Sequence, residues 1–96
     1  MSLDFHPEAK SEFDEAYLWY EHQREGLGTD FVRCVNEVLE IIQRNPEIYA
    51  PAENRIRRAL VRRFPFGVFY REIPSGIRII AIFHSKRNPI RWQIRK

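Results

Sequence analysis

Residues 66–84 read FGVFYREIPSGIRIIAIFH, two runs of β-branched and aromatic residues separated by a turn signal. The composition of each run favours a β-strand, and Pro74-Ser75-Gly76 between them favours a tight turn. We therefore predict an antiparallel hairpin formed by strands Phe66–Ile73 and Ile77–His84.

The pairing of side chains across this hairpin suggests its register. Placing Ile73 opposite Ile77 produces favourable cross-strand neighbours, namely Glu72 with Arg78 and Tyr70 with Ile80. A slip of one residue would turn every side chain of one strand to the other face, and the sequence leaves that alternative open.

Two further strands are expected outside the hairpin. Arg57–Phe64 has the same strand-like composition, and Leu3–Phe5 is a short apolar-polar-apolar stretch that suits an edge strand. Asn88-Pro89 ends the last strand, and the remaining tail, Ile90–Lys96, places Trp92 and Ile94 on one side.

Helical spacing dominates the residues between the first strand and position 46. Pro7 favours a helix start, and an apolar stripe follows at Ala9, Phe13, Ala16, Tyr17 and Tyr20. Gly26 and Gly28 are expected to end this helix in a tight turn. Thr29 is a candidate cap for a second helix with Asp30 in its first turn, and Asn45-Pro46 closes it. The second stripe consists of Phe31, Val35, Val38, Leu39 and Ile42.

The predicted order of elements is β-α-α-β-β-β. Helices segregated from strands indicate an α+β fold, in which an antiparallel sheet packs against an N-terminal helical hairpin. With 96 residues, 44% of them hydrophobic, the chain is expected to form one domain spanning residues 1–96.

Charge is distributed unevenly along the chain. Residues 1–48 carry eleven acids and four bases, a net charge of −7, and residues 49–96 carry two acids and twelve bases, a net charge of +10. The overall value of +3 therefore hides a strongly basic second half, which indicates an acidic or polyanionic partner.

Several classes of protein are excluded by composition. A single cysteine, Cys34, rules out an intramolecular disulfide, and we expect it to be a buried thiol. No apolar run is long enough to span a membrane, and the N-terminus lacks the features of a signal peptide. We expect a cytoplasmic protein that does not associate with membranes. No metal-ligand spacing involves the histidines, so no metal or cofactor is expected.

Several motifs in this order resemble the RelE/ParE superfamily of toxins from type II toxin–antitoxin systems, particularly its ParE-like or plasmid stabilisation branch. The matching features span nearly the whole chain: Pro7 and Ala9, Gly26-Leu27-Gly28 with Phe31, Pro46, Arg58, Arg63-Phe64-Pro65-Phe66, Tyr70-Arg71, and His84-x-x-Arg87-Asn88-Pro89-x-x-Trp92. Asn88 departs from the pattern, which usually has Asp between that Arg and Pro.

The resemblance implies a growth-inhibiting toxin neutralised by a cognate antitoxin, whose acidic or amphipathic segment wraps around the toxin. ParE-like members poison DNA gyrase, whereas RelE-like members cleave mRNA on the ribosome without metal. The cleaving enzymes have an Arg where this chain has Gly67, and a tail tyrosine where this chain has none after Tyr70. We therefore favour gyrase inhibition, with a RelE-like mRNA endonuclease as the alternative. A non-toxic basic binding module is a further alternative.

Candidate site residues come from the basic second half. If the protein is a nuclease, the catalytic group would be His84, Arg87, Arg62 and Arg63, because RNA cleavage needs an acid or base beside cations that hold the phosphate. Residues expected to bind a partner or nucleic acid are Arg58, Arg62, Arg71, Arg78, Lys86, Arg87 and Trp92.

Each candidate also has a purely structural interpretation. His84 could bond the turn that follows its strand, and the arginines could form a solvated face balanced by acids of the first helix. Because side chains alternate along a strand, Arg62 and Arg63 are expected on opposite faces of the sheet. Tyr17 and Tyr20 are expected in the core, with Trp19 exposed or at an interface.

Overall fold

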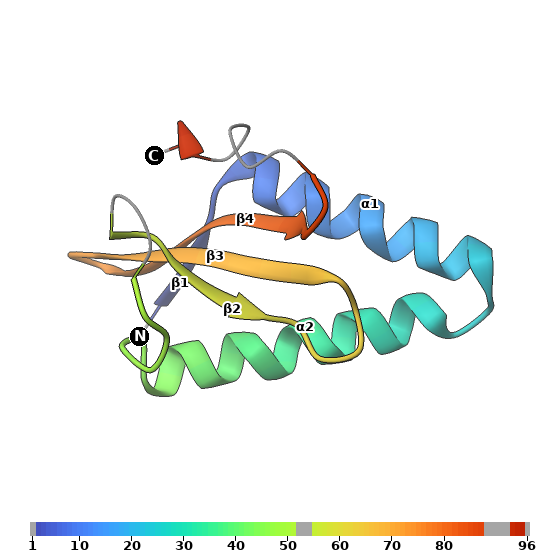
Figure 1. Ribbon diagram of the computed structural model, residues 1–96, viewed down its shortest axis with the longest axis horizontal. Coiled ribbons are helices and arrows are strands. Elements are labelled where there is room, and N and C mark those ends of the chain that lie inside the picture. The colour runs from blue at the N-terminus through green and yellow to red at the C-terminus, as the bar shows by residue number, and fades with distance from the viewer. Residues whose placement is uncertain (1, 52–54, 88–92, 96) are drawn as a thin grey trace.

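The computed structural model describes residues 2–51, 55–87 and 93–95. Its elements follow the predicted order: β1 (Ser2–Phe5), α1 (Pro7–Gln23), α2 (Leu27–Arg44), β2 (Arg57–Leu60), β3 (Phe66–Ile73) and β4 (Gly76–His84). Figure 1 shows α1 and α2 as a hairpin packed against the sheet. The predicted α+β fold is confirmed.

The four-stranded sheet has the order β1-β4-β3-β2. The pairs β2–β3 and β3–β4 are antiparallel as expected, but β1 runs parallel to β4. The sheet is therefore mixed and not wholly antiparallel. The helices α1 and α2 return the chain to the end of the sheet at which β1 began, so β2 and β4 run in the same direction as β1.

Next to its turn, the β3–β4 hairpin differs by one residue from the predicted register. The register shifts between Phe69 and Tyr70, so Phe66–Phe69 pair with β4 as the predicted register implies. Ile73 pairs with Gly76, so Glu72 faces Ile77 and Arg71 faces Arg78. The turn contains two residues, and Gly76 begins β4 with φ of 147°. A side chain there would meet the β1 backbone, because an added Cβ would lie 2.4 Å from the carbonyl oxygen of Ser2. Glycine at this position thus permits close approach of β1.

The second helix begins earlier than predicted. Its N-cap is Gly26, which has a left-handed φ of 87°, and Thr29 lies within the first turn and does not cap the helix. Gly28 also lies inside the helix, where it is buried against α1. The second apolar stripe and all of the first except Tyr17 nevertheless face the core as predicted; Tyr17 is half-buried beside Gly28 of α2.

The strand predicted at Arg57–Phe64 is shorter, because it ends at Leu60. Beyond that residue the chain turns back toward β3, with the Val61 N–H donating to the carbonyl of Phe66 and Arg63 adopting a left-handed φ of 73°. Of the predicted tail, Trp92 lies outside the described residues and Ile94 is exposed.

The core lies mainly between the sheet and the helical hairpin. Large buried side chains of that layer include Phe31, Val35, Ile42, Val68, Tyr70, Ile77 and Ile79. A smaller cluster occupies the opposite face of the sheet, on which neither α1 nor α2 lies, and consists of Ile56, Phe69, Ile80, Ala81 and Phe83. We call this second face the open face.

Candidate functional site

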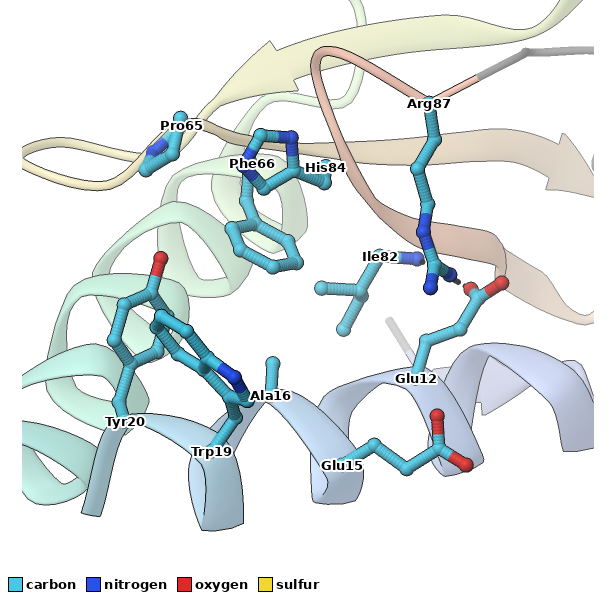
Figure 2. A pocket seen from close by; sticks show the side chains of 10 residues that line it. All are labelled: Glu12, Glu15, Ala16, Trp19, Tyr20, Pro65, Phe66, Ile82, His84 and Arg87. Atoms are coloured by element: carbon cyan, nitrogen blue, oxygen red, sulfur yellow. Dashed lines mark hydrogen bonds between the residues drawn. The ribbon is translucent and has the colours of Figure 1, made fainter. Parts of the chain in front are cut away.

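Two clefts flank the end of β4. The first, here called the helix cleft, has a volume of about 540 Å³ and lies between α1 and the sheet (Figure 2). Its lining consists of Glu12, Glu15, Ala16, Trp19, Tyr20, Pro65, Phe66, Ile82, His84 and Arg87. The second, here called the open-face cleft, has a volume of about 530 Å³. Its lining consists of Ala50, Arg58, Leu60, Gly67, Phe69, Phe83, His84, Ser85, Arg87 and Gln93.

His84 is the last residue of β4 and lies on the wall that the two clefts share. It pairs with Phe66 across the hairpin, and the two rings pack edge to face with centroids 5.3 Å apart. Its Nδ1 accepts a hydrogen bond of 3.1 Å from the backbone N–H of Lys86. In the neutral imidazole the proton therefore resides on Nε2, so His84 presents a hydrogen-bond donor to its surroundings.

Arg87 is the second residue common to both clefts. The turn after β4 is closed by a bond from its backbone N–H to the carbonyl of His84. Its guanidinium lies 5.9 Å from the centre of the Phe83 ring. Lys86 is exposed in the same turn. His84 and Arg87 are thus brought together, as the sequence suggested.

Arg62 and Arg63 are held away from these clefts by acids of α2. Arg62 lies 3.0 Å from a carboxylate oxygen of Glu37, and Arg63 lies 3.9 Å from one of Asp30. The hydrogen bond that Arg62 donates to the Glu37 carboxylate raises the pKa of Arg62 further above its ordinary value. Neither arginine lines either cleft, so the structure does not assemble the four predicted catalytic residues in one place.

The other predicted binding residues are spread along the open face. Arg58 is exposed and lines the open-face cleft, next to Gly67 of the neighbouring strand. Arg71 lies directly opposite Arg78, whose guanidinium forms an ion pair with Asp4 of β1. Trp92 lies outside the described residues.

A buried ion-pair network near the C-terminus was not predicted. The side chain of Arg95 is only 6% exposed, and it lies 2.6 Å from Glu12 and 3.2 Å from Glu8. Arg95 also donates to the carbonyl of Ile80, while Glu12 accepts from the N–H of Ile82. The sequence contained one indication that Glu12 is buried. Glu12 falls at helical spacing between Ala9 and Ala16, on the apolar face of the helix.

This network covers the edge of β4 beyond Ile79, where the strand pairs with β3 on one side but with no described strand on the other. The pairing of β1 with β4 ends at Ile79, and in the described part of the chain no other strand lies beyond it. Carboxylate and guanidinium groups there satisfy backbone groups of Ile80 and Ile82. Unpaired strand edges attract other chains, so the network protects this half of the edge.

Two tyrosines are perturbed by burial. The hydroxyl of Tyr70 donates to the carbonyl of Pro46 at 2.7 Å, and burial raises the pKa of Tyr70 to about 12. Burial also raises the pKa of Tyr20, which packs against Phe31 and Phe64. Both side chains are therefore neutral at neutral pH and serve to pack the core.

Within residues 2–51, 55–87 and 93–95, no cluster of three or more His, Cys, Asp or Glu side chains could hold a metal ion. In the same residues, no helix is both long and apolar enough to cross a membrane. Cys34 is buried in the core of the helical hairpin.

Comparison with known proteins identifies the family to which this fold belongs. The architecture defines a small α+β protein of the RelE/ParE type, and a solved structure described as "Chromosomal ParDE TA system from P. aeruginosa" shares it with a TM-score of 0.78. That match has 22% identity and covers 90% of this chain and 97% of the other. The family described as "ParE toxin of type II toxin-antitoxin system, parDE" matches residues 3–89. The chain therefore belongs to the ParE toxin family. No curated protein sequence matches it significantly.

Proposed function

We propose that this protein inhibits bacterial growth by binding DNA gyrase, and that a cognate antitoxin neutralises it in the cytoplasm. The observation that carries this proposal is the match to the ParE toxin family over residues 3–89. Members of the ParE-like branch act on gyrase, whereas the RelE-like residues at two positions are absent here, as Gly67 and the lack of a tyrosine after Tyr70 show.

The geometry near His84 supports this choice over cleavage of mRNA. Its Nδ1 is occupied by the N–H of Lys86, so the neutral ring has no nitrogen free to accept a proton from a 2′-hydroxyl. Arg62 and Arg63 contact acids of α2 and do not approach His84. A metal-independent endonuclease would need another general base.

The alternative endonuclease still has one observation in its favour. His84, Arg87 and Arg58 all line the open-face cleft, so an imidazole and two cations surround one space. Primer extension on RNA from cells expressing the protein would detect ribosome-dependent cuts. Cuts that disappear in His84→Ala would favour the endonuclease over the gyrase inhibitor.

The helix cleft is the surface that best suits the antitoxin. Ala16, Trp19 and Phe66 give it an apolar lining, and Trp19 is 59% exposed although it is a large aromatic residue. An amphipathic antitoxin segment could bury these side chains between α1 and the sheet (Figure 2). Glu15 on its border favours a basic group in that segment, whereas Glu12 is already paired with Arg95.

The decisive experiment measures supercoiling by purified gyrase with increasing amounts of the toxin. We expect supercoiling to decrease or cleaved DNA to accumulate, and addition of the antitoxin to reverse the effect. Undiminished supercoiling at saturating toxin would reject gyrase as the target. Unimpaired growth of cells expressing the protein without its antitoxin would instead favour a non-toxic binding module.

A further inference from the structure

Two exposed arginines border the open-face cleft without a carboxylate beside them. Arg58 of β2 and Arg87 after β4 both line the cleft, and none of the residues that line it is acidic. Among the residues that the structure describes, neither arginine has a carboxylate within ion-pair distance. Other arginines of the basic half are neutralised by carboxylates: Arg57 by Glu72, Arg62 by Glu37, Arg63 by Asp30, Arg78 by Asp4 and Arg95 by Glu12. A ligand of this cleft should therefore bring its own negative charge.

The shape of the cleft depends on a missing side chain. Leu60, Gly67 and Phe83 are paired neighbours across β2, β3 and β4. An added Cβ at Gly67 would lie 3.3 Å from Cγ of Arg58, so the aliphatic part of Arg58 borders the space above Gly67. The guanidinium of Arg87 lies 5.9 Å from the centre of the Phe83 ring. The glycine thus leaves room for a ligand that contacts both cations.

The apolar surface of this cleft suits a peptide better than a nucleobase. Phe69 and Phe83 are only 8% and 2% exposed, so they offer a base almost no ring surface on which to stack. The exposed apolar group is aliphatic, since Leu60 is 62% exposed and lies two residues from Arg58 on the same face of the strand. Guanidinium groups bind carboxylates through two parallel hydrogen bonds. The matching ligand is a protein segment with neighbouring acidic and aliphatic side chains.

We propose that the open-face cleft is the surface with which the toxin holds its target, and that it takes an acidic, extended segment of that protein. One carboxylate of the segment binds Arg58, a second binds Arg87 and the Nε2–H of His84, and an aliphatic side chain covers Leu60. The choice of the target rests on the proposed function, in which the helix cleft with Glu15 on its border takes the antitoxin.

Fluorescence anisotropy tests the chemistry of the cleft. The probe is a short fluorescein-labelled peptide of alternating glutamate and leucine, titrated with the full chain, and the control peptide has glutamine in place of glutamate. We expect Arg58→Ala and Arg87→Ala each to raise the Kd of the glutamate peptide about tenfold, as for loss of a hydrogen bond between charged groups. The glutamine peptide should bind the wild-type chain about tenfold more weakly or less. Arg24→Ala removes an exposed arginine at the end of α1 and should leave the Kd nearly unchanged.

Charge reversal tests whether the cleft contacts the target. We expect Arg58→Glu to raise the toxin concentration for half-inhibition of gyrase supercoiling about tenfold, because a carboxylate would face those of the bound segment. Arg24→Glu is the matched control and should inhibit like the wild type. The affinity of Arg58→Glu for the purified antitoxin should equal that of the wild type. If the wild-type chain does not inhibit gyrase, the proposed function fails, while the expected peptide titration would still support an acidic protein partner.

Several results would overturn the inference. Equal binding of the two peptides, or equal losses in Arg24→Ala and the cleft variants, would show that the cleft does not select carboxylates. A single-stranded oligonucleotide that displaces the glutamate peptide at a lower concentration of charge would assign the cleft to nucleic acid. Inhibition of gyrase by Arg58→Glu at the wild-type concentration would exclude the cleft from the contact with the target and leave the proposed function standing. A tenfold loss of antitoxin affinity in Arg58→Glu would assign the cleft to the antitoxin.

Discussion

At the scale of single residues, the arginines of the basic half divide by their partners. Arg62 and Arg63 link the turn after β2 to α2, and Arg78 forms an ion pair with the first strand. Among the described residues, no carboxylate lies within ion-pair distance of Arg58 or Arg87, which line one cleft. A count of positive charges therefore overstates the surface available to a partner, because much of it is balanced internally.

Tyr70 leads to a prediction about alkaline pH. Burial raises its pKa from the ordinary 10.0 to about 12, so the folded state favours the neutral phenol more than the unfolded chain does. This contribution to stability is complete below pH 10.0 and is lost as the pH rises to about 12. We expect the free energy of unfolding by urea to fall over that range, and to fall less in Tyr70→Phe.

The same variant has a separate effect at neutral pH. Loss of the hydrogen bond from the Tyr70 hydroxyl to Pro46 should cost about 1 kcal/mol. Tyr20 contributes to the alkaline decline in both proteins, because burial also raises its pKa. Identical pH profiles for the wild type and Tyr70→Phe would contradict the assignment to Tyr70.

At the scale of the elements, the crossing of α1 and α2 depends on Gly28. A Cβ at this position would lie 2.7 Å from the carbonyl oxygen of Tyr17 and 2.9 Å from a carboxylate oxygen of Glu21. That carboxylate accepts hydrogen bonds from the N–H groups of Gly26 and Gly28. The start of α2 is thus held by Glu21 of α1 and not by a cap from its own sequence.

We expect Gly28→Ala to reduce the free energy of unfolding by about 2 kcal/mol, because the methyl group would force the two helices apart. Thr29→Ala, one residue along the same turn, should change it by less than about 0.5 kcal/mol because Thr29 is exposed and caps nothing. Urea denaturation followed by circular dichroism measures both. A loss of unfolding free energy in Thr29→Ala that exceeds the loss in Gly28→Ala would support the capping role predicted from the sequence.

The C-terminal residues provide a second prediction for the elements. Arg95→Ala would leave Glu12 without its cation, although the Glu12 side chain is only 13% exposed, and would remove a donor to the carbonyl of Ile80. We expect a loss of about 3 kcal/mol in the free energy of unfolding. Arg44→Ala is the matched control, since its ion pair with Glu40 is exposed and 3.9 Å long. Equal losses of unfolding free energy in Arg95→Ala and Arg44→Ala would show that the buried network contributes no more to stability than a surface ion pair.

At the scale of the whole molecule, the two halves of the chain present different surfaces. The acidic half forms the helical hairpin and the border of the helix cleft, and the basic half forms most of the sheet. His84 and Arg87 lie between the two clefts, so a ligand in one is close to a ligand in the other.

Trp19 tests the assignment of the helix cleft to the antitoxin. Because exposed tryptophans at interfaces commonly contribute about 2 kcal/mol or more, we expect Trp19→Ala to raise the Kd of the antitoxin complex about 30-fold. Leu18→Ala is the control, since Leu18 is 53% exposed on the same helix but does not line the cleft. Calorimetric titration with the purified antitoxin measures both values. Equal affinities of the two variants would place the antitoxin elsewhere.

Much of the fold was predictable because local signals agree with the tertiary structure. Apolar stripes at helical spacing identified both helices, and β-branched and aromatic runs identified the strands of the sheet. The ordered motifs from Pro7 to Pro89 also indicated the toxin family, which the match over residues 3–89 confirms. These features lie along the chain itself, so no knowledge of distant contacts was needed.

Other features depend on contacts between residues far apart in the chain. In the parallel pairing of β1 with β4 the backbone of Ser2 lies close to Gly76, and the register of the hairpin shifts between Phe69 and Tyr70. Arg95 and Glu12 are separated by 83 positions, so no spacing could indicate that they meet. The carboxylates that pair with the arginines are likewise brought into place by the packing of α2 on the sheet and by the pairing of β1 with β4. Charge and composition thus predict a basic sheet, but the folded arrangement determines which of its cations remain available to a ligand.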